Sequence, residues 1–65
     1  MHLKLHDTVR TTIDLPSHNI RKGSIGAIVS ILEHPQLAYE VEFTDNAGRT
    51  IAELALLPEQ VELVK

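Results

Sequence analysis

Turn-forming residues recur at short intervals along this sequence, and this spacing limits what the chain can fold into. They occupy residues 14–19, 22–23, 33–36, 45–48 and 58–60. The spacers between them are short and rich in Val, Ile, Thr, Tyr and Phe, which are strand-forming residues. The pattern predicts five strands, at about residues 5–13, 25–32, 38–44, 49–56 and 61–64. Five short strands at this spacing indicate an all-β barrel or sandwich.

The length and composition restrict the chain to one small folded domain, residues 1–65. With 43% hydrophobic and 23% charged residues, the chain has the composition of a globule rather than of a disordered tail. Cysteine is absent, which excludes a disulfide framework and a thiolate metal site and fits a reducing, cytoplasmic location. No stretch approaches the roughly 18 apolar residues that cross a membrane. We therefore expect no signal peptide and no membrane partner.

The net charge of −3 is unevenly distributed. Residues 1–22 carry four basic and two acidic residues, for a net charge of +2, whereas the rest carries two basic and seven acidic residues, for −5. A general nucleic-acid binder presents a continuous positive surface, which this distribution does not make.

The segment 38–44 is the clearest strand, because Tyr39, Val41 and Phe43 alternate with Glu40 and Glu42. We expect the first set to face the core and the glutamates to face solvent. A four-residue loop at 45–48, ended by a positive φ at Gly48, would keep the next strand's glutamate out of the core. The predicted pairs are Thr44 with Arg49, Val41 with Ala52, Glu40 with Glu53, and Tyr39 with Leu54.

Two other segments have a distinctive pattern. Residues 25–32 are apolar at both odd and even positions, which suits a strand that is central, bent or bulged, and leaves its inward set open. Residues 56–61 are too short for an α-helix and end in apolar residues, which predicts a single 3₁₀ turn that leads into the last strand.

The Asp7-Thr8-Val9 start, a polar excursion and the Lys-Gly-x-x-Gly turn at 22–26 resemble the opening of KOW-type and other SH3-like small barrels. In such barrels the first glycine allows a tight turn and the second lets the strand approach its neighbour. Taken whole, the chain resembles a family of short bacterial proteins of unknown function. The matching positions are Asp7, Val9, Leu15, Pro16, 22–29, 39–43, Asp45, 48–50 and 57–61. The resemblance implies a five-stranded SH3-like barrel with a short 3₁₀ turn before the last strand, and no activity.

Catalytic and metal sites have little support in the sequence. His2 and His6 would lie on one strand face but about 13 Å apart, too far to share one ion. His18 and His34 lie in different loops, so we expect four exposed histidines. No nucleophile motif is present and the Lys-Gly-x-x-Gly turn lacks the features of a phosphate loop. We expect no enzyme activity, no cofactor and no metal.

Three surfaces remain as candidates. In the predicted register Glu40 opposes Glu53, with Glu42 and Ile51 nearby, which indicates either a solubilising face or an acidic face with an apolar spot for a basic partner protein. A second surface is the loop 14–22. It occupies the place of the recognition loop in SH3-like barrels, but the chain lacks the row of aromatic residues that binds proline-rich peptides. The third comprises Arg10, Arg21 and Lys22, which would contact RNA or DNA as a KOW-like module does.

We expect a non-enzymatic protein-interaction module. An antitoxin-like or immunity-like role, in which a small acidic domain neutralises a basic effector, is a specific version of this hypothesis. Because most of the chain is acidic, nucleic-acid contact is the weaker alternative. A homo-oligomeric structural subunit, in which a second copy covers the strand edges and the apolar strand 25–32, is a further alternative.

Overall fold

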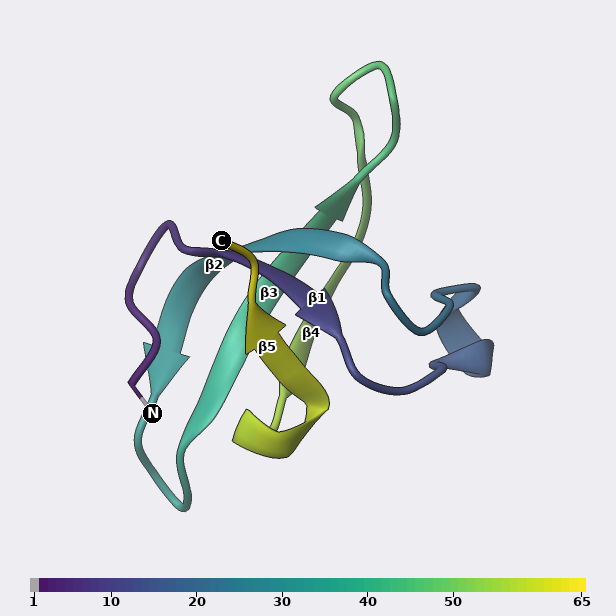
Figure 1. The fold of residues 1–65 in the computed structure, drawn as a ribbon. Helices are drawn as coiled ribbons and strands as arrows, with labels where there is room; N and C mark the ends of the chain where they lie inside the picture. The colour runs from purple at the N-terminus through teal and green to yellow at the C-terminus, as the bar shows by residue number, and fades with distance from the viewer. Residues whose placement is uncertain (1) are drawn as a thin grey trace.

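Five antiparallel strands and two 3₁₀ turns make up the fold in the computed structural model, which describes residues 2–65 (Figure 1). The elements in chain order are β1 (Thr8–Thr11), η1 (Pro16–His18), β2 (Ile25–Leu32), β3 (Ala38–Thr44), β4 (Thr50–Leu56), η2 (Pro58–Gln60) and β5 (Val61–Leu63). The predicted all-β fold is therefore confirmed, including the 3₁₀ turn before the last strand.

The strands form one sheet in the order β4-β3-β2-β1-β5, with every neighbouring pair antiparallel. Figure 1 shows that β2 curves strongly along its length, so that β1 and β5 lie across β3 and β4. The strands β4 and β5 are the two edges of this sheet. In residues 2–65 no ladder joins β4 to β5, so the sheet is curled but is not closed into a barrel by backbone hydrogen bonds.

The first strand is shorter than the predicted 5–13, because the chain turns just before it. His6 has a φ of 72°, in the left-handed region that interrupts a strand. The turn is closed by the N–H of Asp7, which donates to the carbonyl of Lys4, and by the N–H of Lys4, which donates to the Asp7 carboxylate. The prediction that His2 and His6 share a strand face is therefore wrong, since neither lies in a strand.

The core lies on the concave side of the curled sheet. The inward orientation predicted for Tyr39, Val41 and Phe43 is confirmed, because each is at most 2% exposed. Residues from all five strands contribute to the same cluster, which explains how a short chain with few aromatic residues encloses an interior. The buried hydrophobic residues are Leu3, Val9, Ile20, Ile28, Tyr39, Val41, Phe43, Leu56 and Val61.

The strand β2 is central and bulged, which explains why it is apolar at both odd and even positions. Its pairing with β3 shifts between Ile28 and Ser30. Ile28 is fully buried before the bulge, and Ile31 packs against the core after it. The close approach predicted at Gly26 is also confirmed, because a Cβ placed there would lie 2.6 Å from Cγ1 of Val41 and 2.8 Å from the carbonyl oxygen of Glu42.

The register between β3 and β4 differs from the prediction. Glu42 stands opposite Glu53, and Glu40 stands opposite Ala55, so the residues from Tyr39 to Phe43 pair two positions further along β4 than expected. Thr44 pairs with Thr50 instead of Arg49, a shift of one position. The physical cause has two parts. The loop between the paired residues Thr44 and Thr50 has five residues instead of the predicted four, and β4 has one extra residue at the irregularity between Phe43 and Thr44. A shift of two preserves which side chains share a face, so the predicted outward orientation of the glutamates holds although the individual pairs were wrong.

Candidate functional site

The acidic face comprises Glu40, Glu42, Ile51 and Glu53, on the outer side of the β3–β4 hairpin. Glu42 and Glu53 are direct cross-strand neighbours, and Glu40 follows on the same side of β3. Ile51, next to the irregularity in β4, leaves 57% of its surface exposed. The structure thus brings the four predicted residues onto one hairpin, with Glu42 rather than Glu40 opposite Glu53.

The carboxylate of Glu42 has one hydrogen-bond partner among the described residues. The hydroxyl of Thr50 donates to Oε2 of Glu42 at 2.6 Å, which holds this carboxylate beside the strand. Glu53 is exposed, while Glu40 and Glu42 are half-buried. Across the sheet Glu42 neighbours Ala27, which neighbours Thr8, so no charge on this row of β1 or β2 faces the pair.

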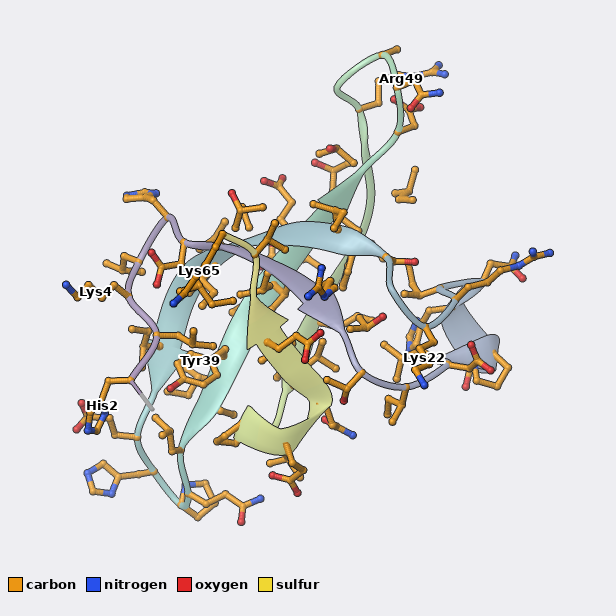
Figure 2. The ribbon with its side chains drawn as sticks, viewed as in Figure 1. His2, Lys4, Lys22, Tyr39, Arg49 and Lys65 are labelled. Carbon is orange, nitrogen blue, oxygen red and sulfur yellow. The ribbon has the colours of Figure 1, made fainter. Side chains whose placement is uncertain are left out.

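Within residues 2–65 the structure contains two ion pairs, and neither involves the acidic face. Arg10 pairs with Glu62 across the β1–β5 ladder, and Arg49 pairs with Asp45 at 3.0 Å in the hairpin loop. Figure 2 shows Arg49 at the far tip of this loop, away from the body of the sheet. The three carboxylates of the acidic face therefore have no cationic partner in the part of the chain that the structure describes.

The three basic residues of the nucleic-acid alternative do not act as one free cluster. The guanidinium of Arg10 is engaged by Glu62 on the outer face of the sheet. Arg21 and Lys22 belong instead to the connection between β1 and β2, where the N–H of Lys22 donates to Oδ1 of Asp14 at 2.7 Å. Sequence reasoning could not foresee the engagement of Arg10, because its partner lies 52 residues away along the chain.

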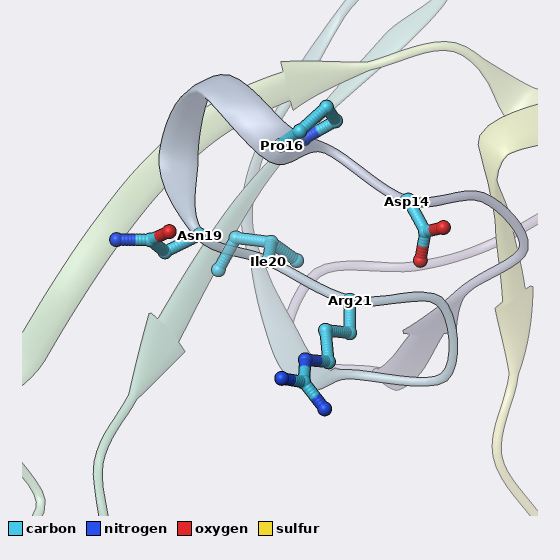
Figure 3. Close-up of a pocket in the computed structure, with 5 residues that line it drawn as sticks. All are labelled: Asp14, Pro16, Asn19, Ile20 and Arg21. Carbon is cyan, nitrogen blue, oxygen red and sulfur yellow. The ribbon is translucent and has the colours of Figure 1, made fainter.

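A surface hollow of about 370 Å³ lies on the predicted loop 14–22. Its lining consists of Asp14, Pro16, Asn19, Ile20 and Arg21 (Figure 3). Ile20 is 3% exposed and anchors the loop in the core, and a backbone bridge between Leu15 and Ile20 holds the loop's shape. The hollow therefore has an ordered backbone, with Arg21 at its rim (Figure 3).

The four histidines are exposed, as expected, and lie in loops or turns. Among residues 2–65 no group of three His, Asp or Glu side chains has the geometry to hold a metal ion. No helix in the same range has the length and hydropathy needed to span a bilayer.

Sequence reasoning missed the position of β4 at the edge of the sheet. The segment 49–56 is predicted as a strand, but its sequence does not indicate whether one or two neighbours flank it. Among residues 2–65 only β3 flanks it, so Glu53 and Ala55 are exposed beside an open edge.

Comparison with known proteins identifies one family. A family model described as a domain of unknown function, DUF4926, matches residues 5–63, which is nearly the whole chain. No curated protein matches the chain. No solved structure matches it either.

Proposed function

The chain belongs to the DUF4926 family, whose function is unknown, and from this premise we propose that it is a non-enzymatic module that binds a basic partner protein through the acidic face. One observation carries the proposal. Glu42 and Glu53 oppose each other directly, with Glu40 beside them, and among residues 2–65 no cation offsets them.

The energetic argument is that this arrangement is unfavourable in the isolated chain. Directly opposed like charges in a sheet cost roughly 0.2–1 kcal/mol, and a small domain has little stability in reserve. Lys or Arg side chains of a partner would turn the repulsion into attraction and would steer the partner during its approach. Exposed Ile51 supplies an apolar contact next to the charges.

The more specific parts of the proposal concern the biological setting. We propose a bacterial, cytoplasmic protein with an SH3-like, KOW-like scaffold, and an antitoxin-like or immunity-like role in which it neutralises a basic effector. The strand order, in which β1 to β4 follow one another and β5 returns to pair with β1, supports the scaffold, and the acidic body of the chain supports the role.

The test is affinity recovery of tagged protein from its native lysate, with and without nuclease, using charge-matched variants. The double variant Glu42→Lys with Glu53→Lys reverses the acidic face. The control, Glu33→Lys with Glu59→Lys, changes the net charge by the same amount at exposed positions elsewhere. We expect a stoichiometric basic protein that survives nuclease, is lost with the first variant and is retained with the control.

Three results would contradict the proposal. Loss of the partner with both double variants would show that overall charge, not the acidic face, governs binding, and its retention with both would show that the acidic face is not needed. Recovery of nucleic acid alone, sensitive to nuclease, to salt and to Arg21→Ala with Lys22→Ala, would favour the KOW-like alternative.

A further inference from the structure

Among the described residues, β4 has a strand paired to it on one side and none on the other. The strand runs from Thr50 to Leu56, and its single charged residue is Glu53. Natural proteins block edge strands with charged residues, Pro, bulges or short length. β4 has no Lys or Pro, and its irregularity lies near the Thr50 end, so the segment from Glu53 to Leu56 carries a single charge and a regular ladder to β3. The other edge, β5, is only three residues long. The sheet thus has one edge suited to pairing with another strand, and it borders the acidic face.

The hydrogen bonds between β1 and β2 determine which residues of β4 turn their backbone N–H and C=O groups toward the open edge. Ile28 donates its N–H to the carbonyl oxygen of Asp7 at 3.0 Å, so the backbone groups of Ile28 face the β1 side. In antiparallel strands these groups alternate from residue to residue, so Ala27 turns toward β3. Its partner there is Glu42, whose backbone groups consequently face β2.

The same alternation decides which groups of β4 are free. Val41, the neighbour of Glu42 along β3, turns its backbone toward β4 and pairs with Leu54. The residues on either side of Leu54 must face the opposite way. The N–H and C=O groups of Glu53 and Ala55 therefore point away from β3, toward the open edge, and both residues are exposed.

We propose that the partner binds as an added β-strand along the free edge of β4, with a Lys or Arg side chain placed next to Glu53. This inference rests on the proposed function and specifies how the partner contacts the acidic face. The backbone groups of Glu53 and Ala55 provide the pairing, and the carboxylates of Glu42 and Glu53 select a basic residue on the outer side of the added strand. The partner segment is extended and basic on alternate positions.

Charge decides between such a partner and a second copy of this chain. Pairing β4 with β4 of another copy would merge two acidic faces into one, with six carboxylates and no cation among the described residues of either. An added strand with alternating basic residues would instead supply the missing positive charge.

The test adds to the full chain a synthetic peptide with capped termini, in which Lys and Val alternate. Binding is monitored at low ionic strength by NMR and by amide hydrogen exchange. In the free protein the amides of Glu53 and Ala55 should exchange fast, because they face the open edge. Saturating peptide should slow both by about tenfold or more, whereas the amide of Leu54 should change little. An alternating Glu-Val peptide and an N-methylated Lys-Val peptide, which cannot pair, are the controls and should have no effect.

A variant of Ala55 separates backbone pairing from charge. Ala55→Pro removes the edge N–H without touching the ladder to β3, and prolines are tolerated at such edge positions. It should abolish peptide binding, while Ala55→Val should retain it. If the proline variant does not fold, the exchange data on the unaltered chain still decide the question.

Three results would overturn the inference. No binding of the Lys-Val peptide would show that the edge does not accept a basic strand. Binding that requires Glu42 and Glu53 but leaves the edge amides unprotected would retain the proposed function and reject strand addition. Protection of Glu53 and Ala55 that rises with protein concentration in the absence of peptide would identify a second copy as the occupant.

Discussion

The hydroxyl of Thr11, buried at the end of β1, donates to the carbonyl oxygen of Arg21 at 3.0 Å. The same carbonyl accepts the N–H of Ser24 at 3.0 Å and its hydroxyl at 2.6 Å. Three donors on one oxygen tie the backbone of the loop 14–22 to the sheet. The side chain of Arg21 is thus displayed on a fixed backbone, even though it lies on the surface.

Replacing Thr11 with Val should lower the free energy of unfolding by about 1 kcal/mol, because a buried hydrogen bond is lost while the side-chain shape is kept. The loss should be no larger, since Ser24 still satisfies the Arg21 carbonyl. Urea unfolding measures the difference. Thr8→Val, on the exposed side of the same strand, is the control and should be nearly neutral; an equal loss at both positions would contradict this assignment.

Glu53→Lys should raise the stability of the isolated chain by roughly 0.2–1 kcal/mol, because a cross-strand repulsion with Glu42 becomes an attraction. Thermal unfolding at low salt provides the measurement, and added salt should diminish the gain. Glu33→Lys makes the same charge change away from the pair and reports the effect of net charge alone. A gain of the same size in this control would remove the pair as its cause.

Gly26→Ala should destabilise the fold by about 1–3 kcal/mol, because the added methyl group would overlap Val41 and the backbone of Glu42. Gly48 offers a contrast, since it has open space around it but a φ of +81°. Gly48→Asn should therefore cost much less, as Asn tolerates the left-handed region. Equal costs for the two variants in urea unfolding would show that contact with β3 does not determine the need for Gly26.

The hairpin loop should lose stability in acid as Asp45 is protonated. The N–H of Arg49 lowers the pKa of this carboxyl most; desolvation opposes the shift, while the N–H of Ala47 and the Arg49 guanidinium add to it. Because the folded pKa is lowered, the carboxylate's contribution is present above its ordinary pKa and is lost as pH falls through the folded value.

An NMR titration of the Asp45 carboxyl should therefore give a midpoint below that of an unstructured aspartate. Asp45→Asn keeps an acceptor oxygen but no charge, so this part of the pH dependence of unfolding should disappear in the variant. A midpoint at or above the ordinary aspartate value would contradict the role of the loop N–H groups.

Features that depend on neighbouring residues were predictable from the sequence. The bounds of β2 and β3 match the expected 25–32 and 38–44. The inward side of Tyr39 and Phe43 follows from their alternation with glutamates. The positive φ angles of Gly23 and Gly48 follow from the turns that contain them. Each depends on a local requirement, either a period of two or a backbone angle that only a few residues adopt.

Only part of the candidate site was predictable, because the sequence reveals the face on which a residue lies but not its partner on the next strand. That Glu42 and Glu53 share the outer face was foreseeable, because a register shift of two residues preserves the face. That they oppose each other directly depends on the five-residue loop between Thr44 and Thr50 and on the irregularity between Phe43 and Thr44, which no local pattern marks.

By itself, the sequence determined the number and order of the strands, the 3₁₀ turn before the last one, and the inward or outward side of the residues of β3, because these depend on interactions within a few positions. Only the tertiary structure decided that Arg10 is engaged by Glu62 and that β4 lies at a free edge. Both depend on which distant strands pair, and that is settled by the burial of one shared core rather than by any single segment.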